Sequence, residues 1–256
     1  MGGALLRGWL AENIVAANHT AVFNRRVDST ARVAGETGAR AASDASDALR
    51  GANVLLIAVK PHLVIPVLTS SYDAIEPGCL VLSVAAGVRI KTMEAALPPG
   101  TTVVRSVPNT PSAIGAGAAA FCRGTHVTDA DAALVVRLFE AVGRVVEVVA
   151  EDQIDAALGV SSSGVAYLYL LLEALIDGGV RAGLPRDTAR TLAAQTALGA
   201  ARMLLETDAH PGTLKDAVTT PGGTTMAGLH KLESAGVRGA LMDAVLAARD
   251  RARELG

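Results

Sequence analysis

Short apolar runs alternate with amphipathic stretches through the first half of the chain. Four of these runs predict strands: Val54 to Val59, Leu80 to Val84, Thr102 to Ser106 and Ala118 to Phe121. A continuous apolar run of this length is typical of a strand buried on both faces of a parallel sheet. Helical stretches separate most of the runs, so the pattern predicts an α/β fold with a Rossmann-like parallel sheet.

Weaker patterns complete this first half. They predict a strand at Ala21 to Phe23, a helix near Ser29 to Gly35, a short strand around Ala39-Arg40, a helix start at Ser43 to Ala45, and a last strand at Val145 to Val149.

The second half has a helical pattern instead. We expect helices at Asp152 to Asp177 with an interruption at Ser161 to Gly164, at Leu184 to Leu205 with Pro185 in the first turn, at Pro211 to Val218, at Thr224 to Glu233 and at Val237 to Leu255. The chain therefore divides into a nucleotide-binding domain at 1–150 and an all-helical domain at 151–256.

Charge and composition narrow the possible partners. The net charge of −2, with scattered arginines, argues against nucleic acid or an anionic membrane as partner. The most apolar run, Val165 to Ile176, is too short to span a bilayer and contains Glu173. No signal peptide is recognisable, which predicts a cytoplasmic protein. Cys79 and Cys122 lie in apolar stretches and are expected to be buried free thiols, and no histidine pair has metal-ligand spacing.

The first residues match only part of a nucleotide-binding motif. A Rossmann domain opens with a strand, Gly-x-Gly-x-x-Gly and a helix. Gly2 fits the third glycine of that motif and Ala4 to Leu10 its helix, so the first strand and two glycines are expected to lie before Met1. On these glycines alone, an ordinary helix start is the better interpretation.

A basic tripeptide, Asn24-Arg25-Arg26, follows the strand that comes next. NAD enzymes place an acid at this point to bind the ribose hydroxyl, whereas arginine favours the 2′-phosphate of NADP. We therefore predict NADP in preference to NAD, with solvated arginines as the alternative.

Three strand ends carry small residues and prolines. They are Val59-Lys60-Pro61, Ala85-Ala86-Gly87 and the segment around Asn109, between Pro108 and Pro111. Ligands of open α/β sheets bind beyond the carboxyl ends of the strands. We expect a flat nicotinamide ring to approach the backbone here.

These strand ends resemble segments of the pyrroline-5-carboxylate reductases, in order and at the right spacing. The helical half is similar to the same family through Ala166-Tyr167, Glu173-Ala174, Ala193 to Gln195, Glu206-Thr207, His210 to Gly212, Leu214 to Asp216 and the loop Thr220-Pro221-Gly222-Gly223-Thr224-Thr225.

The resemblance implies hydride transfer from NAD(P)H to the imine carbon of 1-pyrroline-5-carboxylate, giving proline. It also implies a homodimer or a larger homo-oligomer of dimers, with the active site between one subunit's nucleotide domain and the helical domains of the pair.

The loop Thr220 to Thr225 suits a carboxylate anchor. Gly222 and Gly223 expose backbone N–H groups ahead of a helix N-terminus, and Thr220 and Thr224 add hydroxyls. By the resemblance, Thr225 is the catalytic hydroxyl near the ring nitrogen. The alternative is a plain turn before a helix.

Other residues have structural interpretations. Glu173 and Asp177 match family positions but fit a structural or interface role better than acid catalysis. Lys60 fits cofactor positioning better than a Schiff base, and His210 is expected to cap a turn.

The chain departs from the family pattern at two points. The family has Gly within the cluster Ser161 to Ser163 and Pro in place of Val165, and the first strand is absent. Two alternatives therefore stay open: a non-catalytic dimerising relative that has lost nucleotide binding, and a related imine reductase with another substrate.

Overall fold

The structure is a computed structural model that describes residues 1–254. Its contacts divide the chain into two compact units, Met1–Ser163 with the C-terminal segment from Leu246, and Gly164–Val245. The helix interpreted as ending at Leu255 is described as far as Glu254, and Leu255 lies outside the described residues. The sequence places the domain division some thirteen residues earlier, at 150, and assigns the whole of the last helix to the second domain.

The first unit is built on a five-stranded sheet in the order β3-β4-β5-β6-β7. The strands are β3 (Val54–Ile57), β4 (Leu80–Ser83), β5 (Thr102–Val107), β6 (Gly117–Arg123) and β7 (Gly143–Glu147). Each of the five predicted runs therefore forms a strand, with ends shifted by up to two residues.

Two strands, β6 and β7, run against the prediction of a parallel sheet. β3, β4 and β5 are parallel, but β6 pairs antiparallel to β5, and β7 pairs parallel to β6. The connection from Val107 to Gly117 holds only the short helix η3 (Thr110–Ile114). A parallel crossover needs a dozen or more residues, so this connection returns the chain in the opposite direction.

A second, two-stranded sheet holds β1 (Ala21–Val22) and β2 (Arg40–Ala41), which are parallel. Among residues 1–254, no strand joins this pair to β3. Within the described residues, the edge of β3 that faces away from β4 therefore has no ladder partner.

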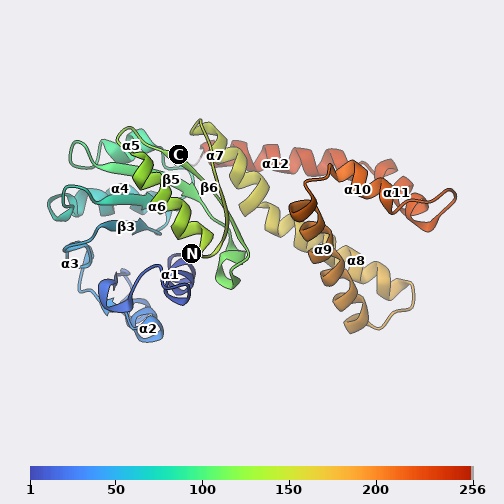
Figure 1. Cartoon of the computed structure of the whole chain (residues 1–256), viewed down its shortest axis with the longest axis horizontal. Helices are drawn as coiled ribbons and strands as arrows, with labels where there is room; N and C mark the ends of the chain where they lie inside the picture. Colours follow the sequence, from blue (N-terminus) through green and yellow to red (C-terminus); the bar gives the residue numbers. More distant parts are fainter. Residues whose placement is uncertain (255–256) are drawn as a thin grey trace. The chain divides into compact units, whose positions relative to one another are not determined.

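Helices cover both faces of the large sheet (Figure 1). They are α1 (Gly2–Ala11), α3 (Ala45–Leu49), α4 (Pro61–Ser70), α5 (Ile90–Glu94), α6 (Asp129–Glu140) and α7 (Asp152–Ala157). The helix α2 (Val27–Thr37) packs instead against α1 and the small sheet, and the short 3₁₀ turns are η1 (Ala17–His19) and η2 (Tyr72–Ala74).

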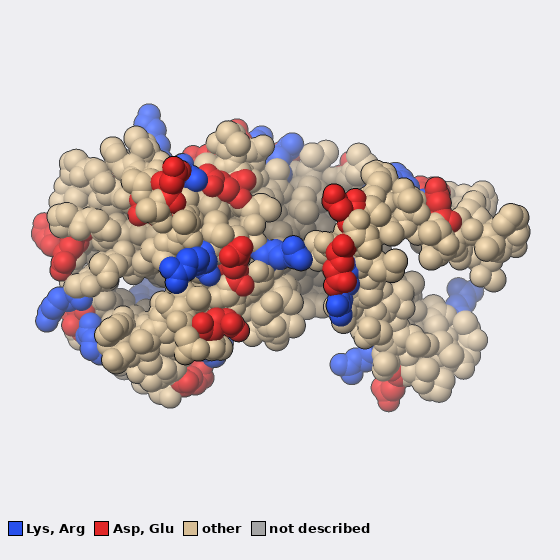
Figure 2. Space-filling view, viewed as in Figure 1, with Lys and Arg blue, Asp and Glu red and all other residues tan. Residues whose placement is uncertain are grey.

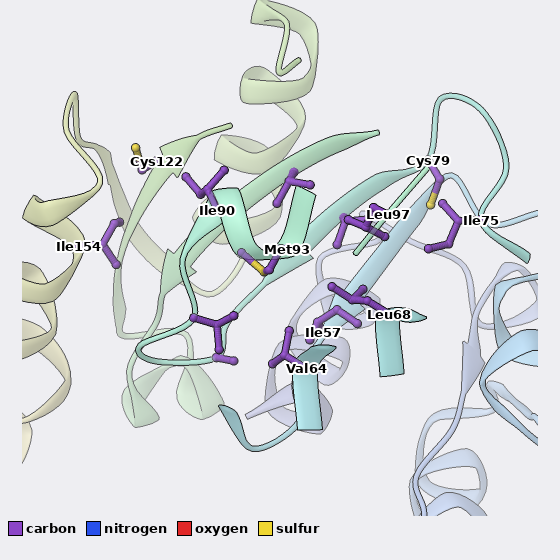
Figure 3. Packing of buried hydrophobic residues seen from close by; sticks show 14 of the residues in the cluster. Ile57, Val64, Leu68, Ile75, Cys79, Ile90, Met93, Leu97, Cys122 and Ile154 are labelled. Atoms are coloured by element: carbon purple, nitrogen blue, oxygen red, sulfur yellow. The ribbon is translucent and has the colours of Figure 1, made fainter. Parts of the chain in front are cut away.

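Alternate residues along the strands belong to two separate hydrophobic cores, one on each face of the sheet. One cluster joins Val81 and Val103 to α4, α5 and α7 through residues such as Leu68, Met93 and Ile154 (Figure 3). The other joins Leu82 and Val104 to α1 and α6. The period of two along each strand accounts for this division between faces.

A π-turn, η4 (Leu158–Ser162), follows α7 at the end of the first unit. The Ser163 N–H donates to the Leu158 carbonyl at 2.9 Å, a bond across five residues. The predicted interruption at Ser161 to Gly164 is therefore a change of helical register, and the helix does not break there.

The second unit is entirely helical in its described residues. It contains α8 (Gly164–Arg181), α9 (Arg186–Thr207), α10 (Pro211–Ala217), α11 (Thr224–Ser234) and most of α12 (Val237–Glu254). Pro185 stands at the N-cap of α9, one position before the predicted first turn. Tyr167 on α8 donates its hydroxyl to the Ala244 carbonyl of α12 at 3.1 Å.

The helical stretch Asp152–Arg181 is longer than the sequence predicted. By length and composition it is the one helix, within residues 1–254, that could cross a membrane, and only 11% of its most apolar window is buried. The apolar run from Val165 is thus part of a 30-residue helix with an exposed apolar surface.

Candidate active site

The predicted strand-end residues lie along one edge of the first unit. Ile57, Ser83 and Arg105 are register partners on the parallel strands β3, β4 and β5. The segments that follow them, Val59 to Pro61, Ala85 to Gly87 and Pro108 to Thr110, therefore leave the sheet at the same level. The structure brings these three predicted segments together.

Hydrogen bonds fix the β4 end closely. The Ser106 hydroxyl donates to the Ser83 carbonyl at 2.8 Å, and the Ala85 N–H donates to the Ser83 hydroxyl at 3.3 Å. Ala85 is buried, and Gly87 has a φ of 80°, which favours glycine. This end is rigid and lined by small residues, so a flat ring can approach its backbone.

Gly2 lies at the start of α1, close to the end of β3. A Cβ at this position would come within 2.9 Å of the Ala58 Cβ, closer than real Cβ atoms approach. In dinucleotide-binding motifs the third glycine serves this close packing of helix on strand. The geometry therefore suits the assignment of Gly2 to that glycine and places the positive end of α1 at the same edge.

The Asn24 to Arg26 segment forms a fixed turn after β1. The Asn24 N–H donates to the Thr30 hydroxyl at 2.8 Å, and the Arg26 N–H donates to the Asn24 Oδ1 at 3.0 Å. Arg25 and Arg26 are exposed and join none of the ion pairs found within residues 1–254. Two unpaired guanidinium groups on a fixed turn suit a phosphate ligand.

The loop Thr220 to Thr225 belongs to the second unit. Pro221 and Gly222 take the central positions of a turn closed by a bond from the Gly223 N–H to the Thr220 carbonyl at 2.9 Å. Gly222 has a φ of 68°, as a type II turn requires at its third residue. A Cβ on Gly223 would lie 2.3 Å from the Thr220 Oγ1. Gly222 is therefore needed for its positive φ, and Gly223 is needed because a side chain would not fit beside Thr220.

This turn leads directly into α11. Gly223 is its N-cap and supplies no side-chain cap, so the first N–H groups of the helix have no intrahelical partner. Thr224 is exposed and Thr225 is half-buried. The arrangement presents backbone donors and two hydroxyls to a small anion.

The other residues weighed from the sequence have structural contacts. The His210 Nδ1 accepts from the Gly212 N–H at 3.0 Å and caps α10, as predicted. Asp177 pairs with Arg186 at 2.9 Å, joining the end of α8 to the start of α9. Lys60 and Glu173 are exposed.

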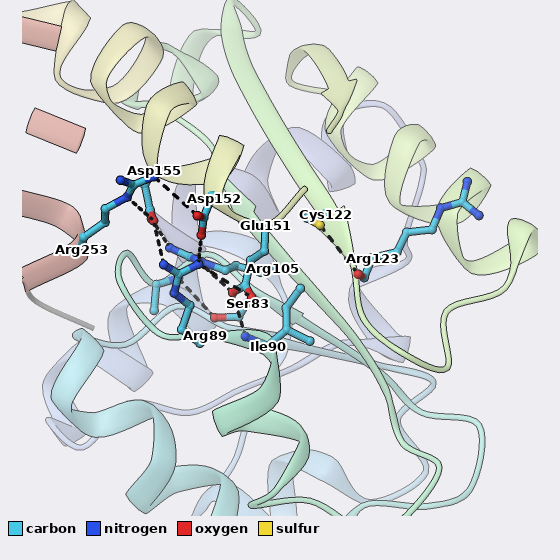
Figure 4. Close-up of polar contacts among 11 residues, drawn as sticks. Ser83, Arg89, Ile90, Arg105, Cys122, Arg123, Glu151, Asp152, Asp155 and Arg253 are labelled. Carbon is cyan, nitrogen blue, oxygen red and sulfur yellow. Dashed lines mark hydrogen bonds and ion pairs between the residues drawn. The ribbon is translucent and has the colours of Figure 1, made fainter. Parts of the chain in front are cut away.

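A cluster of charged side chains escaped the sequence analysis (Figure 4). Arg105 of β5 is 1% exposed and pairs with Asp155 at 2.5 Å and with Glu151 at 2.9 Å. Arg89 and Arg253 also pair with Asp155, and both pair with Asp152 beside it. An arginine inside the apolar run Thr102 to Ser106 was the available signal, because a buried charge needs a buried partner.

Two kinds of pKa change accompany this packing. The hydrogen bond from Arg89 lowers the pKa of Asp152 below its ordinary value of 3.8. Burial raises the pKa of the Cys79 and Cys122 thiols. Both cysteines are free and buried, as predicted.

Fold and strand-end edge together define a class, the Rossmann-type oxidoreductases that carry a helical second domain. Two family models match the chain: "Pyrroline-5-carboxylate reductase dimerisation" at residues 151–255 and "NADP oxidoreductase coenzyme F420-dependent" at residues 1–87.

Individual pyrroline-5-carboxylate reductases match this chain over its whole length. A pyrroline-5-carboxylate reductase of Methanosarcina acetivorans is 41% identical over 256 residues, which cover all of this chain and 94% of the relative. The solved structure of the Coxiella burnetii enzyme is 36% identical and has a TM-score of 0.92. The match covers all of this chain and 94% of the Coxiella chain. The Plasmodium falciparum enzyme, solved with NADP bound, has 30% identity, the same coverage and a TM-score of 0.89. The chain belongs to the pyrroline-5-carboxylate reductase family.

Proposed function

We propose that this chain reduces 1-pyrroline-5-carboxylate to L-proline with NADPH, the last step of proline biosynthesis. The observation that carries the proposal is the full-length likeness to pyrroline-5-carboxylate reductases. That likeness includes both the strand-end edge and the loop Thr220 to Thr225.

The proposed cofactor side lies in the first unit. NADPH supplies a hydride when bound. Arg25 and Arg26, with Asn24 shaping their turn, hold the 2′-phosphate, which favours NADP over NAD. Gly2 lets α1 approach the strand end. The remaining proposed contacts come from the three strand ends: Val59, Lys60, Pro61, Ala85, Ala86, Gly87 and the backbone at Asn109.

The proposed substrate side is the loop before α11. The turn fixed by Gly222 and Gly223 offers N–H groups to the substrate carboxylate, with the hydroxyls of Thr220 and Thr224 beside them. Thr225 is the proposed catalytic residue, placed to assist protonation of the ring nitrogen. An imine is already polarised, so alignment contributes most of the rate.

The second unit is proposed to be completed by a second copy of the chain. Its buried apolar residues are only Ala189 and Ala193, among those described. Most of the exposed large apolar side chains of the molecule lie on it, including Leu170, Met203 and Met242. A shallow hollow of about 190 Å³ between α8 and α9 has an apolar lining that includes Leu175 and Leu192. So much exposed apolar surface marks an interface.

A dimer also accounts for the exposed apolar helix Asp152–Arg181 without a membrane. Figure 2 shows Lys and Arg side chains dispersed among Asp and Glu on the face shown. We propose a cytoplasmic homodimer, or a larger assembly of such dimers. In it, residues 1–150 bind the nucleotide, and residues 151–256 form the dimer and bind the substrate.

One observation suits a second candidate. The exposed apolar side chains of the second unit mark an interface whether or not the first unit binds a nucleotide. A dimerising relative that has lost nucleotide binding would also have this surface. A reductase acting on another cyclic imine is the remaining alternative, because a carboxylate-binding turn does not select ring size.

Two measurements separate these candidates. NADPH binding, followed by the change in its fluorescence, distinguishes an enzyme from a dimerising relative. Turnover of 1-pyrroline-5-carboxylate against a six-membered cyclic imine carboxylate identifies the substrate. The proposal expects NADPH to bind and the five-membered ring to be preferred; a chain that dimerises but does not bind NADPH contradicts it.

A further inference from the structure

The carboxamide of Asn109 is occupied at both ends by the protein itself. Its Oδ1 accepts from the Ala118 N–H of β6 at 2.8 Å, and its Nδ2 donates to the Ser161 carbonyl at 3.1 Å. The residue is only 8% exposed. A side chain so engaged is poorly placed to serve as a cofactor ligand, the role expected from the sequence.

A second bond runs beside it in the opposite direction. The Ser162 hydroxyl of the π-turn donates to the Pro108 carbonyl at 3.1 Å. Two successive residues of the loop after β5 are thus fastened to two successive residues of η4.

Hydrogen bonds from other segments support the π-turn. Its bond from Ser163 to Leu158 shifts the register of the helix, and the Ser161 hydroxyl donates to the Ala157 carbonyl at 2.8 Å. A register change alters which carbonyls the helix ladder satisfies. Asn109 therefore donates to a carbonyl of the segment in which the helical register changes.

The same loop borders the strand-end edge. Pro108 and Asn109 follow β5 directly, and Ser106 ties β5 to the end of β4. Earlier on β5, Arg105 pairs with Asp155 and so holds α7 against this strand. The loop is therefore fixed between the sheet edge and the π-turn, at the place where a ring bound at that edge would touch the backbone.

We propose that Asn109 is a positioning residue: by bridging the Ala118 N–H and the Ser161 carbonyl, it holds the loop Val107 to Thr110 against the π-turn and thereby aligns the reactants. This inference rests on the proposed function. It predicts an effect on the rate of hydride transfer and little effect on NADPH affinity, because small misplacements reduce rates strongly.

The variant Asn109→Asp tests this directly. The carboxylate keeps an acceptor for the Ala118 N–H but turns an oxygen toward the Ser161 carbonyl. At pH 8 we expect kcat to fall at least tenfold, while the Kd for NADPH, measured without substrate, changes less than twofold. Ser162→Ala removes only the second bond and is expected to lower kcat by a smaller factor.

A pH profile adds a signature that general loosening of the fold would not give. Burial and the facing carbonyl raise the pKa of the introduced carboxyl. Once protonated, the carboxyl donates to the Ser161 carbonyl again. The ratio of variant to wild-type kcat is therefore expected to rise as the pH falls from 8 to 5. Ala113→Ser, on the exposed part of η3, serves as the control and leaves kcat and Kd unchanged.

Hydrogen exchange supplies a readout without turnover. In Asn109→Asp, amides at 161–165 are expected to exchange faster than in the wild type. If the exchange of these amides is unchanged, Asn109 does not hold the loop against the π-turn, and the proposal is overturned even if kcat falls. A rise in the NADPH Kd matching the fall in kcat assigns Asn109 to direct cofactor binding and overturns the proposal. A wild type without turnover, both as this chain and when extended at Met1 by an apolar strand and Gly-x-Gly, overturns the proposed function and with it the positioning role, whatever the exchange shows.

Discussion

At the scale of single residues, the buried pair Arg105–Asp155 stands out. Both side chains are 1% exposed, and a second carboxylate, Glu151, lies 2.9 Å from the same guanidinium. Removing charges from water costs several kcal/mol each, so such a pair depends on both members being present. It fixes β5 to α7 and so supports the loop that borders the strand-end edge.

Replacing Asp155 by Asn is expected to destabilise the first unit by about 3 kcal/mol, because Arg105 then loses its buried partner. Trp9 is the single tryptophan of the chain, is buried in this unit and donates its indole N–H to the Leu138 carbonyl. Its fluorescence during urea unfolding therefore reports on this unit. Arg32→Ala breaks the exposed Arg32–Glu36 pair of the same unit and is the matched control, with an expected loss of at most about 1 kcal/mol. Equal effects of the two variants would contradict the account.

Asp152 gives a pH-dependent contribution to stability. The hydrogen bond from Arg89 lowers its pKa in the folded chain below the ordinary 3.8. A lowered carboxyl pKa stabilises the fold above the unfolded pKa, and the contribution is lost as the pH falls through the folded one. The wild type is therefore expected to exceed Asp152→Asn in urea midpoint at pH 7, with the gap closing below about pH 3.8. If the difference in urea midpoint did not depend on pH, the charge of Asp152 would not be its cause.

At the scale of elements, the sequence predicted those that depend on local pattern. The runs at Val54, Leu80 and Thr102 became β3, β4 and β5, because burial on both faces demands continuous apolar residues. The direction of β6 depends on the length of the connection before it, which the apolar pattern does not report. The π-turn and the Asn109 bridge depend on contacts between segments about fifty residues apart, so no local pattern contains them.

The turn before α11 gives the element-scale test of the proposed substrate site. A Cβ on Gly223 would lie 2.3 Å from the Thr220 Oγ1 and 3.0 Å from the Thr220 carbonyl oxygen, so Gly223→Ala must displace the Thr220 hydroxyl and crowd the turn. We expect the KM for 1-pyrroline-5-carboxylate to rise at least tenfold, because the N–H groups no longer converge on the carboxylate. The Kd for NADPH should not change, since the proposed cofactor residues lie in the other unit. Loss of NADPH binding alone would contradict this division of roles.

At the scale of the whole molecule, the two units differ in how completely they bury their apolar residues. The first has two clusters of large buried side chains, whereas the described residues of the second bury only two alanines. A second copy supplies the missing cover in the proposed homodimer.

The exposed face of the second unit tests that assembly. Leu170 is 66% exposed in the single chain. Leu170→Glu is expected to shift the mass in solution, measured by light scattering, toward the monomer, because burying a charge at an apolar interface is costly. Val149→Glu, at a 98% exposed position in the first unit, is the control and should leave the mass unchanged. A wild type that is monomeric at micromolar concentration would contradict the dimer.

The measurement that tests the central claim most directly is the oxidation of NADPH in the presence of 1-pyrroline-5-carboxylate, with proline quantified as product. Because β3 has an unpaired edge, it is made with this chain and with a version extended at Met1 by an apolar strand and Gly-x-Gly. We predict proline formation that depends on the substrate, faster with NADPH than with NADH, and faster in the extended version. NADPH oxidation without proline, or no oxidation by either version, would contradict the assignment of this chain as a pyrroline-5-carboxylate reductase.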